Sequence, residues 1–229
     1  RRGEMHIYAD LRPQELIECQ LKILHTRFMF PLVYHVLPQR EAIIYEDKVV
    51  SVTSFPLKHH YEAPVCGFLF REKKRERTIR KDMTTAWNVP IAFMQYLKKG
   101  ADFITPDGEI IANARLTVAP PPSRSYAYMT DTLFRERFAG YVQGVDLLYH
   151  EATYSKEDQK LAKDSFHSTA EQAACIAQLA KVRKLLLGHF SARYPDPVCL
   201  LPEARAIFPE TYICHDGEVY DVPAIKRNI

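Results

Sequence analysis

The sequence lacks the features that mark several classes of protein. No apolar run approaches the roughly 18 residues of a membrane-spanning helix, and the first residues carry no apolar stretch typical of a secretory signal. We therefore expect no membrane association. The five cysteines include no C-x-x-C pair, which argues against a disulfide framework or a cysteine-based zinc site. This cysteine usage favours a reducing, cytoplasmic location.

The chain also lacks a strong excess of charge of either sign. Its 31 basic and 28 acidic residues leave a net charge of +3, and 47% of its 229 residues are hydrophobic. These values are ordinary for a globular protein and exclude a disordered or histone-like chain. Any binding of nucleic acid must therefore depend on local clusters of basic residues.

Short apolar segments alternate with segments of helical periodicity. Strands are expected at residues 5–8, 32–37, 42–45, 48–56, 65–71, 126–129, 145–149, 185–187, 212–214 and 219–222. Helices are expected from about Pro13, over 155–165 with Ser155 as the N-cap, from Ser168 with Glu171 completing a capping box, and over 200–208. Strands separated by helices of this length predict an α/β fold with a layered sheet.

The composition changes after Phe70. Seven of the eleven residues from Arg71 to Lys81 are basic, and Trp87, Phe93 and Tyr96 follow. We interpret residues 71–118 as an arm inserted into a single domain that otherwise spans 1–229. A solvated charged loop is one reading of this segment. An arm that contacts RNA through its basic and aromatic side chains is the other.

Several histidines and carboxylates directly follow apolar, strand-like runs. They are His59, Asp131, His150, Glu151 and His189. In layered α/β folds the residues just past the carboxyl ends of the strands gather at one edge, where ligands bind. Imidazole and carboxylate groups are ligands of zinc and related hydrolytic metals. The pattern therefore indicates a metal site. Four other histidines are expected to be structural or surface residues. His6, His25 and His35 lie within or beside apolar stretches, and His215 lies near the C-terminal turn.

Three segments resemble motifs of ribonuclease Z, the tRNA 3′-processing endonuclease of the metallo-β-lactamase superfamily. They are HEATY at 150–154, HSTAEQAA at 167–174 and LGHFSARY at 187–194, in the order and spacing of that family. The segments PLKH at 56–59, PDG at 106–108 and TDT at 130–132 are similar to further family segments. The resemblance covers essentially the whole chain and implies a metallo-β-lactamase-like αββα sandwich.

One family motif has no counterpart in the 229 residues. The sequence contains no H-x-H-x-D-H, the first metal-binding motif of the family. Residues 5–8 resemble a segment that follows this motif. The resemblance therefore implies a ribonuclease Z that lacks its N-terminal part, with a fold that is incomplete at that end.

The resemblance also implies roles for individual residues. His59 is similar to a ligand of one zinc ion, Asp131 to the carboxylate that bridges two zinc ions, and His189 to a ligand of the second. His60 is the alternative to His59, which is preferred because it completes the Pro-Leu-x-His pattern. His167 is similar to a histidine that contacts the scissile phosphate and protonates the leaving group without binding metal. Glu151 is similar to the acid that orients it.

These roles imply a zinc-dependent endoribonuclease that removes the 3′ trailer of precursor tRNA and leaves a 3′-hydroxyl. The resemblance implies two zinc ions for a complete site, with other divalent metals as alternatives. It also implies a homodimer. Each ion would keep two ligands here, whereas catalytic zinc usually has three, so the 229 residues alone are expected to be inactive. The residues expected to bind RNA are Lys73, Lys74, Arg75 and Arg77. Another metallo-β-lactamase-fold hydrolase, or an RNA-binding module without catalysis, stays open.

Overall fold

The computed structural model describes residues 3–60 and 64–222, which form two compact units. The larger unit comprises the chain up to Arg71 together with Ser125–Val222, and the smaller unit contains Glu72–Arg124. Among the helices in these described ranges, none combines the length and the apolar character that a bilayer span requires.

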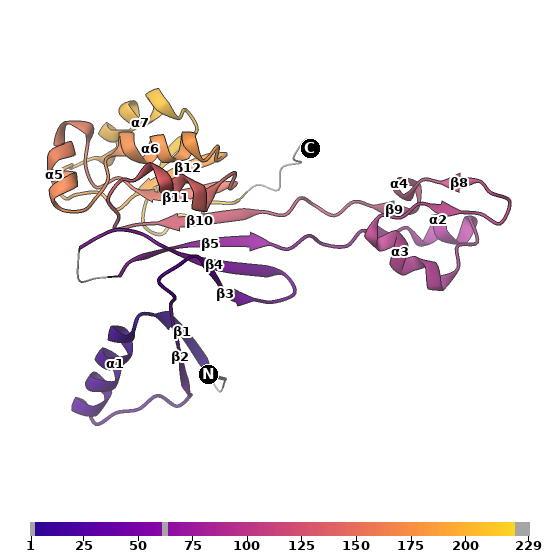
Figure 1. Ribbon diagram of the computed structural model, residues 1–229, viewed down its shortest axis with the longest axis horizontal. Helices are drawn as coiled ribbons and strands as arrows, with labels where there is room; N and C mark the ends of the chain where they lie inside the picture. The colour runs from indigo at the N-terminus through magenta and orange to yellow at the C-terminus, as the bar shows by residue number, and fades with distance from the viewer. Residues whose placement is uncertain (1–2, 61–63, 223–229) are drawn as a thin grey trace. The chain divides into compact units, whose positions relative to one another are not determined.

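A mixed sheet of seven strands forms the centre of the larger unit (Figure 1). In spatial order the strands are β13 (Thr211–Ile213), β12 (Lys184–Gly188), β11 (Leu147–Glu151), β10 (Ser125–Met129), β5 (Cys66–Glu72), β4 (Val50–Pro56) and β3 (Ala42–Glu46). The strands from β10 to β13 are mutually parallel, and β5 pairs with β10 in the antiparallel sense. Three parallel neighbours, β10, β11 and β12, therefore end at the same edge of the sheet.

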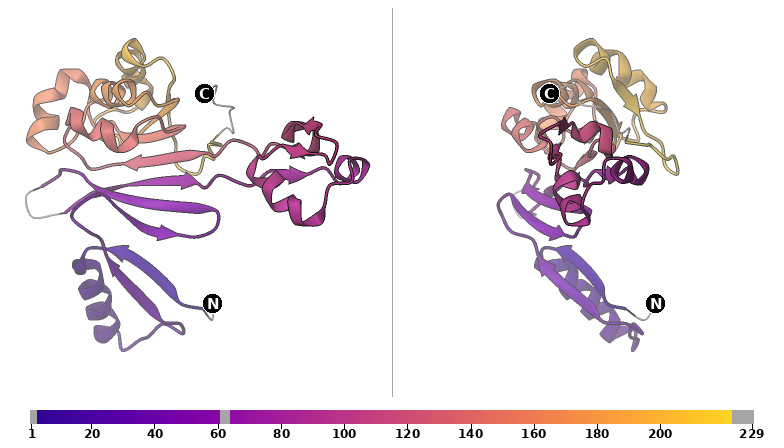
Figure 2. Two further views of the ribbon diagram at one scale, coloured as in Figure 1. Left: turned by 45° about the vertical axis from the view of Figure 1, so that its right-hand side comes forward. Right: turned by 90° about the vertical axis from the view of Figure 1, so that its right-hand side faces the viewer.

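Helices cover one face of this sheet (Figures 1 and 2). They are the 3-10 helices η2 (Glu136–Val142), η3 (Lys156–Asp158) and η4 (Pro197–Leu200), and the α-helices α5 (Gln159–Asp164), α6 (Ala170–Leu179) and α7 (Leu201–Ile207). The main core lies between these helices and the sheet. Leu148, Leu185 and Leu187 from the strands and Ile176 from α6 are at most 1% exposed there. Their apolar contacts fix the strand ends that carry the candidate site.

The first elements form a small βαβ substructure. Strands β1 (Met5–Ala9) and β2 (Leu32–Val36) pair in parallel, and α1 (Leu11–Ile23) connects them. Asp10 caps α1 by accepting a hydrogen bond from the backbone N–H of Arg12 at 2.8 Å. The helix begins at Leu11 rather than at the expected Pro13, because this cap lies two residues earlier.

The smaller unit has a hydrophobic core of its own. It contains β6 (Thr78–Ile79), α2 (Lys81–Ala86), η1 (Ile91–Phe93), α3 (Met94–Lys99), β7 (Phe103–Ile104), β8 (Ile110–Ile111), α4 (Asn113–Leu116) and β9 (Thr117–Val118). Leu97, Ile111 and Leu116 are fully buried, and Trp87 and Phe93 pack against them. One reading of the sequence included these two aromatic residues among its RNA contacts. The structure shows that they take part in the packing that lets this segment form a compact unit.

Three sequence-based expectations about local structure are wrong. The capping box of α6 is formed by Thr169 and Gln172, one position after the expected pair. Ser155 precedes η3 without capping it through its side chain. Residues 219–222 form no strand, although strand residues were expected there. Each of these errors concerns a boundary or a terminus, where the hydrogen-bond partners decide the structure and periodicity carries little information.

The salt bridge between Glu72 and Arg124 joins the two ends of the smaller unit. The Arg124 guanidinium contacts Glu72 Oε1 at 2.5 Å, and the Arg124 backbone N–H donates to Oε2 at 2.9 Å. These hydrogen bonds lower the pKa of Glu72 from 4.5 to about 2, against a smaller opposing effect of desolvation. The charged form of Glu72 is therefore the one that the fold favours.

We expect Glu72→Gln to destabilise the smaller unit by about 1 kcal/mol at pH 7, as is typical of a partly exposed pair. Because the pKa of Glu72 is lowered in the folded state, this stabilisation is complete above pH 4.5 and is lost as the pH falls toward 2. The free energy of unfolding is measured by denaturant titration followed by tryptophan fluorescence. The signal reports on the smaller unit, because Trp87 is the only tryptophan of the chain. A difference between wild type and variant that stays constant from pH 7 to pH 3 would contradict the assignment.

Candidate functional site

Five of the side chains singled out in the sequence gather at one edge of the seven-stranded sheet. Asp131 lies two residues after β10, Glu151 is the last residue of β11, and His189 follows β12 directly. His59 lies three residues after β4, and His167 lies three residues before α6. The convergence follows from the parallel order of β10, β11 and β12, whose carboxyl ends meet at this edge.

Asp131 and His189 are close enough to share one metal ion. The distance from His189 Nε2 to Asp131 Oδ1 is 3.2 Å, so the proximity expected from the sequence is confirmed. Two ligand atoms at about 2.05 Å from a tetrahedral zinc ion lie about 3.3 Å apart, which is similar. Both side chains are 39% exposed, so an ion can reach them from solvent.

His59 reaches the same cluster and is oriented by the backbone. Its Nδ1 lies 3.0 Å from the carbonyl oxygen of Phe166, to which the Nδ1–H donates. Its other nitrogen, Nε2, is then free to bind a metal, the arrangement common in histidine ligands. His59, Asp131 and His167 each offer a ligand atom within 4.8 Å of the others. His60 belongs to none of the ligand groups found among the described residues, so the geometry favours His59.

Glu151 is a fully buried carboxylate, and both of its oxygens accept hydrogen bonds. Its Oε1 accepts the backbone N–H of Thr132 at 2.5 Å, and its Oε2 accepts that of Ser168 at 3.1 Å. Thr153 Oγ1 donates to Oε2 at 2.5 Å. His167 Nδ1 lies 3.1 Å from both oxygens. The expected pairing of Glu151 with His167 is confirmed, and the carboxylate fixes both the loop after β10 and the start of α6.

The pair keeps His167 protonated over a wider pH range. Burial alone would lower the pKa of His167, but the hydrogen bond and the charge of Glu151 outweigh it, and the pKa is raised. Burial would likewise raise the pKa of Glu151, but the hydrogen bonds from His167, Thr153 and Thr132 outweigh it, and the pKa is lowered. Because Glu151 accepts the Nδ1–H, the Nε2–H of His167 is left to face a substrate.

Thr153 connects this pair to His189, a role that the sequence analysis missed. The Thr153 hydroxyl has one hydrogen, which it donates to Glu151, so it accepts a hydrogen bond from His189 Nδ1–H at 2.8 Å. With a hydrogen on Nδ1, the lone pair that His189 can offer to a metal is on Nε2, 3.2 Å from the Asp131 carboxylate. Two electron-rich atoms at this distance require a cation between them, either a proton or a metal ion. The residues present therefore fit a metal ion.

We expect Thr153→Val to remove the Nδ1–H tautomer of His189 without changing the size of the side chain. Loss of a partner of this kind typically weakens metal binding by about 10- to 100-fold. The tautomer is measured by ¹⁵N NMR of histidine-labelled protein, and zinc affinity by competition with a chelator. Thr153→Ser keeps the hydroxyl and should behave as wild type. An unchanged His189 tautomer in the valine variant would contradict the role of Thr153.

His150 does not join the cluster, although the sequence pattern grouped it with the other candidates. It is 1% exposed, and its Nδ1 donates to the carbonyl oxygen of Glu151 at 2.7 Å. Successive strand residues point to opposite faces, so His150 and Glu151 cannot both face the site. Burial is the main effect on the pKa of His150, and it lowers that pKa, which keeps the ring neutral. His150 is a structural residue.

The backbone at this edge adopts conformations that few residues favour. Asp131, Phe166 and His189 have positive φ values of 50°, 62° and 58°. Such backbone strain in non-glycine residues is frequent at functional sites. Gly188 precedes His189 because the Tyr149 side chain packs directly over it, and a Cβ at this position would overlap the tyrosine hydroxyl.

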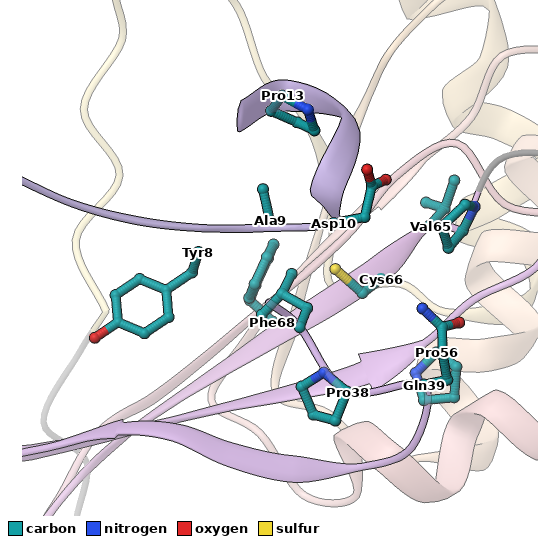
Figure 3. Close-up of a pocket in the computed structure, with 12 residues that line it drawn as sticks. Tyr8, Ala9, Asp10, Pro13, Pro38, Gln39, Pro56, Val65, Cys66 and Phe68 are labelled. Carbon is teal, nitrogen blue, oxygen red and sulfur yellow. The ribbon is translucent and has the colours of Figure 1, made fainter. Parts of the chain in front are cut away.

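A separate pocket of 270 Å³ lies away from these residues (Figure 3). Residues of β1 and the start of α1 line one side, including Tyr8 and Asp10, and residues of β4 and β5 line the other, including Cys66 and Phe68. Burial raises the pKa of the Cys66 thiol, so this pocket offers no thiolate nucleophile. None of the five clustered side chains contributes to it, and the chemistry therefore belongs to the other site.

Known proteins resemble the chain in both sequence and structure. A scan against models of known protein families finds no match. The ribonuclease Z of Bacteroides fragilis is 42% identical over 218 residues, which cover 95% of this chain and 71% of that protein. The ribonuclease Z of Parabacteroides distasonis is 43% identical over 218 residues, with the same shares of the two chains.

Solved structures show the same fold. The short form of human tRNase Z superposes with a TM-score of 0.60 at 20% identity, over 96% of this chain and 67% of that one. A metallo-β-lactamase fold protein of Bacillus subtilis superposes with a TM-score of 0.56 at 16% identity, over 95% of this chain and 65% of that one. With this fold and more than 40% identity to curated relatives, the chain belongs to the ribonuclease Z family of endoribonucleases.

Proposed function

We propose that this protein is a metal-dependent endoribonuclease that removes the 3′ trailer from precursor tRNA and leaves a 3′-hydroxyl on the tRNA. The observation that carries the proposal is the cluster of His59, Asp131, His189 and the Glu151–His167 pair at one sheet edge, in a chain that belongs to the ribonuclease Z family. The name of the human structural neighbour, tRNase Z, supports tRNA as the substrate.

The donor set supports zinc as the resident metal. His59, Asp131 and His189 supply imidazole nitrogen and carboxylate oxygen, the ligand atoms typical of hydrolytic zinc sites. We assign His59 and Asp131 to one ion and Asp131 and His189 to a second. When bound, two such ions activate water and stabilise the negative charge that develops on a phosphate.

His167 is the proposed proton donor of the reaction. Water attacks the phosphorus, the bond from phosphorus to the O3′ of the upstream nucleotide breaks, and His167 Nε2–H donates its proton to that oxygen. The product is a tRNA with a 3′-hydroxyl and a trailer with a 5′-phosphate. Glu151 keeps His167 in the required orientation and favours its protonated state.

Four basic residues at the start of the smaller unit are proposed to contact RNA phosphates. Lys74 and Arg75 are exposed, and Arg75 has a weak 3.8 Å ion pair with Glu72. Arg77 is less available, because its Nε donates to Thr117 Oγ1 at 2.7 Å and fixes the β6–β9 pair. Lys73 completes the set. We therefore base the test on Lys73, Lys74 and Arg75, whose replacement leaves that hydrogen bond intact.

We expect the triple replacement Lys73→Ala, Lys74→Ala and Arg75→Ala to weaken tRNA binding and to flatten its dependence on salt. Each lost phosphate contact should lower the slope of log affinity against log salt by about 0.7 to 0.9. Filter binding or fluorescence anisotropy at several salt concentrations measures the slope. The matched control replaces Lys22, Lys48 and Lys184, which lie in the larger unit. An unchanged slope in the first variant would show that the basic run is a solvated loop.

A polypeptide of these 229 residues is proposed to bind zinc weakly and not to cleave RNA. It supplies two ligands to each of two ions, and its sequence holds no H-x-H-x-D-H to supply more. A fusion that adds the H-x-H-x-D-H segment of a family member should bind zinc at least ten times more tightly. Tight zinc binding by the unfused chain would contradict this ligand count.

The test of the function is cleavage of a precursor tRNA by that fusion. The expected products are a tRNA with a 3′-hydroxyl and a trailer with a 5′-phosphate, and a chelator should abolish the reaction. Hydrolysis of a small phosphodiester without any cleavage of the precursor would favour another hydrolase of the same fold. Binding of the precursor without hydrolysis of either substrate would favour an RNA-binding module.

We further propose that the protein acts as a homodimer in the cytoplasm. The homodimer is the assembly that the resemblance to ribonuclease Z implies, and the substrate is an RNA of the same compartment. Sedimentation of the purified protein tests the assembly. A monomer at micromolar concentration would contradict it.

A further inference from the structure

A groove of 460 Å³ opens beside His167. Leu133 and Phe134 line it from the loop after β10, and Gln159, Lys160 and Lys163 line it from α5. Gln172 of α6 completes the lining. The groove contains His167 but none of His59, Asp131 and His189. The groove therefore adjoins the proposed proton donor without including the proposed metal ligands.

The groove combines positive charge with an aromatic surface. Lys160 and Lys163 are three positions apart on α5, so their side chains share one helix face. Both are exposed, and neither has an acidic partner among the described residues. The ring of Phe134 packs partly against the main core and also lines the groove, where a nucleobase can stack on it. The two lysine charges suit the phosphate of a nucleotide, and the phenylalanine ring suits its base.

Gln172 adds a hydrogen-bond donor. Its Oε1 accepts the backbone N–H of Thr169 at 3.0 Å, which fixes the amide orientation in the capping box of α6. Its Nε2 then faces away from that backbone and makes no hydrogen bond within the described part of the chain. A lining amide with unused N–H groups can donate to acceptors of a base.

The position of the groove selects which nucleotide it takes. In an in-line displacement the attacking and leaving oxygens lie on opposite sides of the phosphorus. His167 is the proposed proton donor to the leaving O3′, so that oxygen lies next to His167, and the groove is lined by the same histidine. We propose that the groove binds the nucleotide on the 5′ side of the cut, the one that keeps the 3′-hydroxyl. Lys160 and Lys163 would contact its 5′ phosphate, and Phe134 would stack on its base.

This inference rests on the proposed function, and the test uses the 229-residue chain with two RNA probes. The upstream probe is a seven-base-pair hairpin with one unpaired 3′ nucleotide that ends in a 3′-hydroxyl. The downstream probe is a single-stranded trailer with a 5′-phosphate. The double variant Lys160→Ala/Lys163→Ala should bind the upstream probe about fivefold or more weakly, with a salt slope lower by about 0.7 to 0.9, and should bind the trailer as wild type does.

The control Lys22→Ala/Lys48→Ala loses the same charge from exposed positions elsewhere in the larger unit and should leave both affinities unchanged. A second readout places 2-aminopurine at the unpaired 3′ nucleotide. Its fluorescence should fall when wild type binds, because the base stacks, and should fall less with Phe134→Leu at saturating protein. Thermal melting confirms that this variant is folded.

The outcomes separate the two proposals. Upstream binding that is equal in wild type and in the lysine variant overturns the groove assignment alone. Weaker binding of the trailer instead of the hairpin overturns it too, because the groove would then hold the downstream nucleotide. A wild-type chain that binds neither the probes nor a precursor tRNA overturns the proposed function together with the groove.

Discussion

His167→Ala should lower the turnover of precursor tRNA by about 100-fold or more and leave the zinc content unchanged, in protein fused to an H-x-H-x-D-H segment. General acid catalysis is typically worth at least this factor. The alanine removes the only proposed donor to O3′, whereas the proposed ligands His59, Asp131 and His189 are untouched. Single-turnover kinetics with excess enzyme measures the effect on cleavage, and metal analysis after gel filtration measures the zinc.

The zinc measurement distinguishes two roles that the geometry alone permits. His167 offers a ligand atom within 4.8 Å of His59 and Asp131, and also within 4.8 Å of Glu151 and His189. If the zinc content falls with the activity, His167 is a ligand and its assignment as proton donor is wrong. His215→Ala is the matched control, because it removes an exposed imidazole that lies outside the cluster.

In the same fused protein, Asp131→Asn should abolish tight metal binding and lower turnover by about 1000-fold or more. As the proposed bridging carboxylate, Asp131 serves both ions, so one substitution weakens both sites. Asparagine suits this test better than alanine, because it tolerates the positive φ of 50° at this position. Isothermal titration with zinc and the cleavage assay measure the two effects.

Asp107→Asn provides the comparison, since it makes the same chemical change at an exposed turn of the smaller unit. Loss of one zinc ion with retention of the other would show that Asp131 is a ligand of a single ion. Retention of both, with activity lost, would assign it to substrate rather than to metal.

The sequence was sufficient to predict which strand ends carry the site. Apolar runs ending at Met129 and Leu187 indicated buried strands, and the polar residue after each run had to lie at the sheet edge. The 3.2 Å contact of Asp131 with His189 and the Glu151–His167 pair are both consistent with that reasoning. Periodicity also separated the strands from the helices through most of the larger unit.

Other features depend on contacts that no local pattern encodes. His150 and Glu151 are neighbours in sequence. Which of the two side chains enters the site depends on the face of the sheet to which each residue of β11 points. The role of Thr153 was missed, although a hydroxyl two positions after a strand-end glutamate points to the same side and was a usable signal. One of the two readings of residues 71–118 included Trp87 and Phe93 among its RNA contacts, because aromatic and basic residues alternate there. Whether an aromatic ring is packed or exposed depends on Leu97, Ile111 and Leu116, which lie far along the chain.

The left-handed backbone at Phe166 has a consequence for directed evolution of the protein. Asp131 and His189 also have positive φ values, but they are proposed metal ligands, so their replacement is expected to cost activity. Phe166 contributes its carbonyl oxygen to His59, an atom that any residue can supply, and its ring lies edge-on to the rings of His59 and His60. Glycine would adopt φ 62° without the steric cost of about 1 to 2 kcal/mol that other residues bear. Libraries selected for heat resistance and for activity should therefore accumulate Gly or Asn at position 166. Asp131 and His189 should stay unchanged in the same libraries.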